Sequence, residues 1–83
     1  MRILYFSWVK DKIGKDQEEI ELQPDLKSIS DLIYYLSNQS NDYKAAFSDL
    51  ESVKCSINME VANLNDKISN EDEIAFFPPM TGG

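Results

Sequence analysis

Residues 71–83 read EDEIAFFPPMTGG. Segment 73–77 is apolar and aromatic, which is typical of a β-strand, and the two prolines after it cannot continue a central ladder. We therefore expect residues 79–83 to leave the sheet as an extended, flexible, functional tail. Gly82 and Gly83 lack Cβ atoms, so a partner's backbone can close tightly around them. The pattern predicts a slim tail whose terminal carboxylate enters a narrow channel.

Alternation along this strand divides its side chains between two faces. Ile74 and Phe76 share one face, whereas Phe77 points to the other. We expect Phe76 to belong to the core and Phe77 to be an aromatic anchor for a partner. The acidic run 71–73 before the strand is interpreted as a solvated turn.

Two helices are predicted from apolar residues spaced three and four positions apart. Ser28 followed by Asp31 resembles a capping box, in which the hydroxyl accepts an N–H of the first helical turn. The apolar face of the main helix consists of Ile29, Leu32, Ile33 and Leu36. A shorter helix repeats this spacing with Tyr43, Ala46, Phe47 and Leu50.

The other segments predict strands and turns. Residues 2–9 are rich in β-branched and aromatic residues and indicate a strand, and the polar residues 10–17 with their glycine indicate a turn. Residues 18–24 alternate, and we expect them to form a hairpin with the first strand. Residues 53–57 alternate as well, and 59–68 suggest a short strand and a turn.

This order of elements predicts an α+β fold. A mixed β-sheet packed on one side by the main helix buries the apolar faces of both. The chain has 83 residues, which suffices for one modest core. We therefore expect a single domain over residues 1–83, with the tail as its functional end.

Composition excludes several classes of partner. The chain carries 15 Asp and Glu against 8 Lys and Arg, for a net charge of −7. This charge repels a phosphate backbone, so we expect no nucleic-acid partner, and it favours a protein partner with a basic face. The apolar run 3–9 is too short for a membrane span or a signal peptide with its flanks. We expect a cytoplasmic protein that does not bind membranes.

The residue inventory also argues against catalysis by this chain alone. It contains no histidine, and Cys55 is the single cysteine, which we interpret as a small core residue within an apolar strand. A Ser–His–Asp triad is therefore excluded, and we expect no metal site and no bound cofactor. No GxxxxGK[ST] loop is present for binding phosphates. Catalytic groups must come from partners.

The C-terminal segment DEIAFFPPMTGG resembles the signature of the small, sulfur-carrying subunit of molybdopterin synthase, the MoaD family. The opening ILYFSWVKDKIG and the central SINME are similar to that family's first strand and turn and its middle strand. The resemblance covers essentially the whole chain. It implies a β-grasp, ubiquitin-like fold, in agreement with the order of elements.

The resemblance also implies a function. An ATP-dependent, E1-like adenylyltransferase converts the terminal carboxylate to a glycyl adenylate, and sulfur transfer then yields a thiocarboxylate, 1-thioglycine. The loaded tail enters the large subunit, in a heterotetramer, and donates sulfur to cyclic pyranopterin monophosphate to form the molybdopterin dithiolene. Gly83 is then the sulfur-bearing residue and Gly82 its slim neighbour. The docking tail comprises Phe77, Pro78, Pro79, Met80 and Thr81.

Two positions depart from the family pattern, and alternative functions stay open. Lys10 and Met80 stand where a bidentate Arg and a smaller aliphatic residue are more common; a Lys does not reproduce the Arg contact, whereas Met adapts to irregular grooves. Trp8 fits either the core or an interface. The alternatives are a sulfur carrier for thiamine thiazole synthesis, a ubiquitin-like protein modifier, and a non-catalytic β-grasp binding module.

Overall fold

A computed structural model describes residues 1–79 of the chain. In chain order the elements are β1 (Arg2–Tyr5), α1 (Ser7–Ile13), β2 (Gln17–Glu19), α2 (Ile29–Ser37), α3 (Asn41–Ala46), the 3-10 helix η1 (Leu50–Ser52), β3 (Lys54–Ile57), β4 (Glu60–Ala62) and β5 (Glu73–Phe77). The predicted helices and strands around residues 28–37, 53–57 and 73–77 are confirmed.

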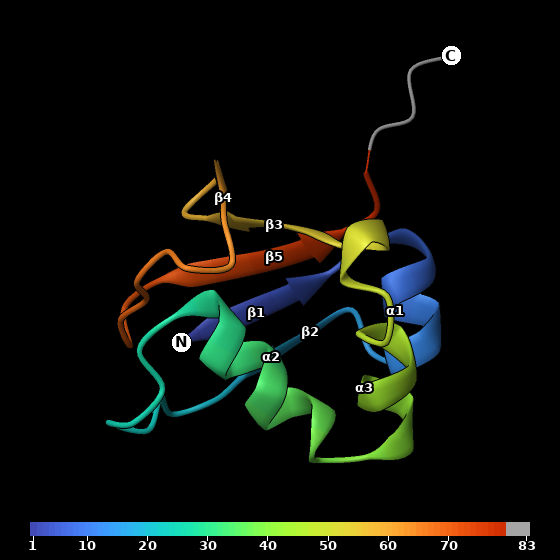
Figure 1. The fold of residues 1–83 in the computed structure, drawn as a ribbon, viewed down its shortest axis with the longest axis horizontal. Coiled ribbons are helices and arrows are strands. Elements are labelled where there is room, and N and C mark those ends of the chain that lie inside the picture. The colour runs from blue at the N-terminus through green and yellow to red at the C-terminus, as the bar shows by residue number, and fades with distance from the viewer. Residues whose placement is uncertain (80–83) are drawn as a thin grey trace.

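Within residues 1–79 the strands form a five-stranded sheet in the order β2-β1-β5-β3-β4. The central strand β5 runs parallel to β1 and antiparallel to β3, so the sheet is mixed. Helix α2 crosses one face of the sheet, and α1 and α3 lie near the end where β5 finishes (Figure 1). The predicted α+β fold, a mixed sheet packed against one main helix, is confirmed.

The core lies between this face of the sheet and the helices. From the strands, Ile3, Tyr5, Ile74 and Phe76 are almost completely buried. From the main helix, every residue of the predicted apolar face is buried: Ile29, Leu32, Ile33 and Leu36. The apolar residues that alternate along the strands therefore pack against those that recur every three or four positions along α2.

Helix α2 begins as its sequence predicts. The Asp31 backbone N–H donates to the Ser28 hydroxyl over 3.2 Å. The Asp31 carboxylate in turn accepts the backbone N–H of Lys27 over 2.9 Å, one residue before the position that a standard capping box uses. The first contact satisfies a donor that the first turn leaves without a helical partner, and the second ties the residue before the N-cap to the same turn.

The predicted strand 2–9 is wrong beyond Tyr5. Ser7 has a positive φ of 56°, which breaks the extended backbone and starts α1. Val9 and Ile13, one helical turn apart, then point into the core, and Gly14 ends the helix in the left-handed region at φ 89°. The expected turn at 10–17 is therefore mostly helix, so β1 and β2 pair antiparallel but are joined by a helix, not by a tight hairpin turn.

Two further predictions are wrong in part. A strand was expected over residues 18–24, but β2 spans Gln17–Glu19 and therefore ends before most of that segment. Ile20 and Leu22 still pack against the core. Leu50 does not continue the apolar face of α3, because that helix ends at Ala46 and Leu50 begins η1 with 41% of its surface exposed.

Candidate functional site

The candidate site lies where β5 ends and the predicted tail begins. Phe77, Pro78 and Pro79 are each partly buried at this end of the sheet. The other predicted site residues lie outside the described residues: Met80, Thr81, Gly82 and Gly83. The structure therefore defines the base from which the predicted tail starts.

Phe76 fixes this base in the core. Its side chain is fully buried, as predicted, and its ring stacks on that of Tyr5 with 6.2 Å between centroids. Phe47 contacts the same ring edge-on, at 5.0 Å. Three aromatic rings, from β1, β5 and the end of α3, thus pack together and hold the C-terminal end of β5 in the core. Such aromatic pairs add to the stability gained from burial.

Phe77 points to the opposite face of the sheet, which we call the open face. The main helix α2 packs against the face that Ile74 and Phe76 share, which is the face away from Phe77 (Figure 1). Cross-strand pairing places Lys54 beside Phe77 and places Val61 in the same row as Ser56 and Ala75. Val61 is 80% exposed. Ser56 and Ala75 in this row are buried, so the apolar surface that the open face presents to solvent comes from Val61 and from part of Phe77.

Phe6 extends the open face and was not found from the sequence. Tyr5 pairs with Phe76 in parallel register, so extended Phe6 continues along β5 beside Phe77. The Phe6 N–H donates to the Phe76 carbonyl over 3.1 Å, and the Phe6 side chain is 48% exposed. One sequence signal could have indicated it. The pair Tyr5–Phe6 has an aromatic residue on each face of its extended segment, as the pair Phe76–Phe77 does in β5.

A polar cluster supports the buried side of the same region. The Glu18 carboxylate accepts the hydroxyl of Tyr5 over 2.7 Å and also the hydroxyl of Tyr43. Lys15 reaches the other Glu18 oxygen at 3.5 Å and lies over the Tyr43 ring, 5.6 Å from its centroid. Glu18 thereby joins β2 to β1 and α3, behind the ring that stacks on Phe76.

Burial and this carboxylate change the acidity of the cluster. Desolvation first, and then the hydrogen bond to Glu18, raise the pKa of Tyr5. The same two causes raise the pKa of Tyr43. The Tyr43 side chain, and to a lesser extent Glu18, raises the pKa of Lys15. Both tyrosines therefore stay protonated at neutral pH, which suits hydrogen-bond donors that hold a fold and not proton-transfer catalysts.

The other residues named from the sequence are Cys55, Trp8, Lys10 and the acidic run 71–73. Cys55 is buried, and desolvation raises the pKa of its thiol, so the interpretation as a core residue is confirmed. Trp8 is half-buried and packs against the core. Lys10 is exposed on α1. In the acidic run 71–73, Asp72 accepts hydrogen bonds from Ser69 and Asn58, so this turn is held by its own carboxylate.

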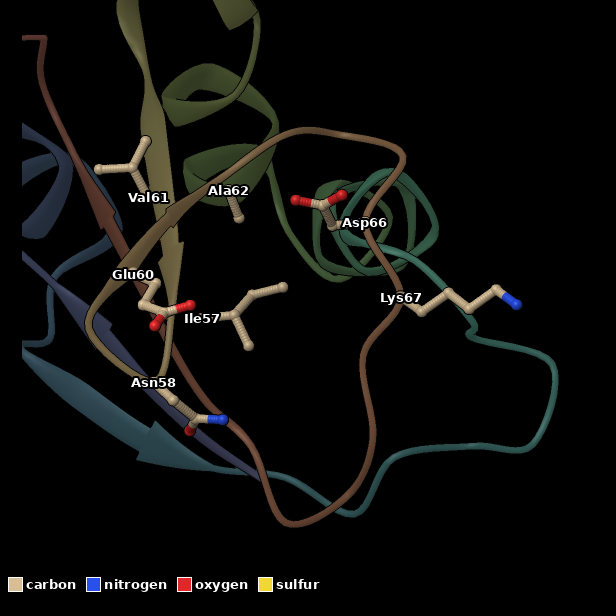
Figure 2. Close-up of a pocket in the computed structure, with 7 residues that line it drawn as sticks. All are labelled: Ile57, Asn58, Glu60, Val61, Ala62, Asp66 and Lys67. Atoms are coloured by element: carbon tan, nitrogen blue, oxygen red, sulfur yellow. The ribbon is translucent and has the colours of Figure 1, made fainter.

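A hollow of about 560 Å³ lies at the other end of the sheet. Figure 2 shows it between the β3–β4 hairpin and the loop that carries Asp66. Ile57, which lines it, pairs with Ile74 near the start of β5, whereas Lys54 pairs with Phe77 at the end. The hollow is therefore separate from the base of the tail.

Residues 1–79 contain no group of three or more His, Cys, Asp or Glu side chains arranged to hold a metal ion. None of the helices in this range combines the length and apolar character needed to cross a bilayer.

Comparison with known proteins gives full-length matches. The model of the ThiS family matches residues 3–83. A protein of Escherichia coli named molybdopterin synthase sulfur carrier subunit is 28% identical, with 100% of this chain and 99% of that protein covered. A protein of the same name from Dictyostelium discoideum is 37% identical, with coverage of 99% and 94%.

Solved structures share the fold. SAMP1 from Haloferax volcanii superimposes with a TM-score of 0.74 at 21% identity, covering 100% of this chain and 98% of that one. A putative molybdopterin converting factor, subunit 1, from Pyrococcus furiosus gives a TM-score of 0.75 at 24% identity, covering 95% of each chain. These likenesses establish the fold, which is the β-grasp arrangement expected above.

Proposed function

Because the chain belongs to the ThiS family, we propose that it is the sulfur carrier subunit of a molybdopterin synthase. The observation that carries this proposal is the full-length match to relatives with that printed name, at 28–37% identity. Those names support a sulfur-carrier role and membership of an enzyme complex. The match includes the strand β5 and the segment that follows it.

The working group in this proposal is the main-chain carboxylate of Gly83. A carboxylate is a poor electrophile, because its leaving group is poor and its charge repels nucleophiles. Adenylation by an ATP-dependent, E1-like adenylyltransferase supplies a good leaving group, and a sulfur donor then converts the adenylate to a thiocarboxylate. The soft sulfur of this 1-thioglycine attacks cyclic pyranopterin monophosphate, which leads to the dithiolene.

The chain's own side chains have no catalytic task in this scheme. The charged and phenolic groups that cluster near the base of the tail, Glu18, Tyr5 and Tyr43, hydrogen-bond to one another. No cofactor is resident in the scheme, and the catalytic groups belong to partner proteins. The protein acts in the cytoplasm, where ATP and the activating enzyme are available.

The large subunit of the synthase is the partner that receives the loaded tail. We assign its docking to the open face, where Phe6 and Phe77 each follow a residue of the paired Tyr5 and Phe76 at the end of β5. An aromatic pair next to a threaded tail provides binding energy without obstructing the reactive carboxylate. The assembly is a heterotetramer with two copies of each subunit. Pro78, Pro79, Met80, Thr81 and Gly82 form the inserted segment.

The alternative functions differ in the acceptor with which the activated C-terminus of the chain reacts. The fold likeness to SAMP1 does not favour a protein modifier, because at 21% identity it establishes only the fold. A carrier for thiamine thiazole synthesis shares the same tail chemistry, so only the acceptor distinguishes it. An inert binding module predicts no chemical change at Gly83 at all.

Reconstitution separates these functions. The chain is incubated with ATP, an adenylyltransferase and a sulfur source, and intact mass detects replacement of one oxygen by sulfur at Gly83. The loaded chain is then combined with the large subunit and the pterin precursor in a single turnover. We expect thiocarboxylate formation and its consumption with dithiolene product. A chain that never gains sulfur contradicts the carrier role, and one that loads without reacting with the pterin contradicts the assigned pathway.

A further inference from the structure

The free edge of β4 lies beside two hollows on the helix side of the sheet. β4 ends the strand order β2-β1-β5-β3-β4 among residues 1–79. Glu60 and Ala62 pair with Ile57 and Cys55 and therefore share the core-facing side with them. An edge strand with open backbone groups is a template for pairing with another chain.

The hairpin geometry makes Val61 the open position on this edge. Asn58 and Met59 both have positive φ, 51° and 73°, so the two-residue turn is closed by the Ile57–Glu60 pair. Hydrogen-bonded and non-hydrogen-bonded pairs alternate along an antiparallel ladder. The next pair, Ser56–Val61, is then the non-hydrogen-bonded one, and the N–H and C=O of Val61 point away from β3.

The first hollow is acidic. Figure 2 shows Glu60 and Asp66 on its walls, with Lys67 directed away from it. The Asp66 carboxylate accepts the Asn63 N–H over 2.9 Å, which fixes its position. The ion pairs found among residues 1–79 involve other carboxylates, so neither Glu60 nor Asp66 is neutralised by a lysine or arginine there.

The second hollow adjoins the first at Ala62, and its lining is mostly apolar, with Glu51, Lys54 and Asn63 also contributing to it. It has a volume of about 270 Å³, which suits one aliphatic side chain, and its walls include Leu50 and Leu64. These leucines are 41% and 38% exposed, so their apolar surface is available to a guest. Val53 and Cys55 form part of the same lining.

We propose that the edge of β4 binds an extended segment of a partner protein that carries an aliphatic residue and a Lys or Arg two positions apart. A strand laid along β4 directs side chains i and i+2 to the same side of the sheet, about 6.6 Å apart. One enters the apolar hollow beside Ala62 and the other meets Glu60 and Asp66. The backbone bonds to Val61, as in other cases of strand addition.

The negative charge beside β4 determines which kind of chain can pair with this edge. A second copy of this chain carries a net charge of −7. In antiparallel pairing centred on Val61 it would place its own Glu60 at the mostly apolar hollow beside Ala62 and no basic side chain opposite Glu60, which is unfavourable for a charged group. A basic segment is attracted by the same carboxylates, so the edge selects a heterologous partner.

This surface goes beyond the proposed function. The acidic hollow lies near the start of β5, whereas the apolar hollow extends to Lys54, which pairs with Phe77 at the end of β5. Phe77 itself lines neither hollow, so binding at β4 should not require its side chain.

The test uses the blocked peptide Thr-Thr-Leu-Thr-Arg-Thr-Thr and backbone amide NMR shifts of the full chain. We expect shifts confined to residues 60–64 and to the neighbourhood of Leu50, saturating at roughly millimolar peptide. Replacing the peptide's Arg by Glu should weaken binding at least tenfold. N-methylation of the Thr between Leu and Arg should abolish binding, because that residue lies opposite Val61.

Variants of the chain test the same contacts. Val61→Pro removes only the outward N–H and should abolish binding, whereas its matched control Val61→Thr keeps the N–H and should bind. Glu60→Lys should reverse the preference between the Arg and Glu peptides. Phe77→Ala should leave binding unchanged.

Four results overturn the proposal: no shifts at β4 up to roughly 5 mM peptide, equal binding of the Arg and Glu peptides, unchanged binding of the N-methylated peptide, or loss of binding in Phe77→Ala. If Val61→Pro does not fold, the N-methylated peptide decides the backbone contact alone. Because the peptide test needs no sulfur chemistry, its failure is distinguishable from failure of the carrier role.

Discussion

The two faces of β5 have different tasks, although their residues alternate along one five-residue strand. Toward the helices, Ile74 and Phe76 are completely buried and contribute to the core. Toward the open face, Phe77 remains partly exposed beside Phe6. Adjacent residues of one strand therefore separate stability from recognition, and a change at either should affect one property with little effect on the other.

The largest expected effect concerns function alone. Deleting Gly83 should abolish sulfur transfer, because the proposed reactive carboxylate would end one residue short, by about 3.5 Å. The free energy of unfolding should stay unchanged, since the described core involves residues no later than Phe76. Intact mass, single-turnover assays and thermal melting measure the two properties in parallel.

Extending the chain by one alanine after Gly83 is the matched control for length. It displaces the reactive atom by a similar distance in the opposite direction and should be nearly as damaging. Normal loading and turnover of the extended chain would show that the terminal carboxylate is not the working group.

The next effect concerns the core face. Phe76→Ala removes a fully buried ring that contacts Tyr5 and Phe47, and should lower the free energy of unfolding by about 3–5 kcal/mol. Chemical denaturation followed by circular dichroism gives this value. A loss well below 1 kcal/mol would mean that the aromatic cluster does not hold the end of β5.

The open face should respond differently. Phe77→Ala should weaken binding of the large subunit by about 1–4 kcal/mol, as for an interface aromatic, with a small change in stability. Calorimetric titration with the large subunit measures the binding. Tyr34→Ala, on an exposed aromatic of α2, is the control and should bind normally. A Phe77 variant that binds normally would remove Phe77 from the docking surface.

The smallest expected effect is a pH dependence on the core side. Burial raises the pKa of Tyr5 above its ordinary value of 10.0, so the folded chain keeps a proton that the unfolded chain releases. Stability should be fully present below about pH 10 and fall as pH rises, by about 1.4 kcal/mol per pH unit for one such group.

Denaturant unfolding between about pH 9 and 11 measures this slope. Tyr5→Phe should reduce it, because the titrating hydroxyl is absent, although the lost hydrogen bond to Glu18 lowers stability at neutral pH. Identical slopes in the two chains would show that Tyr5 ionises freely in the fold.

Local patterns predicted much of this fold. Helix α2 follows from the spacing of Ile29, Leu32, Ile33 and Leu36, and β5 from the alternation that ends at two prolines. The failure at residues 6–13 has a physical cause. YFSWV has strand-like composition, but the positive φ of Ser7 turns the chain, and Val9, Ile13 and the capping Gly14 follow a helical period.

The site was predictable only where it is local. Phe77 follows from alternation next to the prolines. Phe6 and Val61 join the open face through pairing between strands that are distant in sequence, which a local period does not reveal. The predicted tail residues Met80–Gly83 lie outside the described structure, so their roles stay predictions.

The parallel pairing of Arg2–Tyr5 with Glu73–Phe76 also has a consequence for synthesis. Among the strands of residues 1–79, the one synthesised last, β5, is the central one, and without it β1 and β3 have no shared neighbour. Contacts between residues so distant in sequence slow folding and postpone it until the strand has emerged. Chains interrupted before residue 73 should therefore lack the strand that joins the two halves of the sheet and stay unfolded.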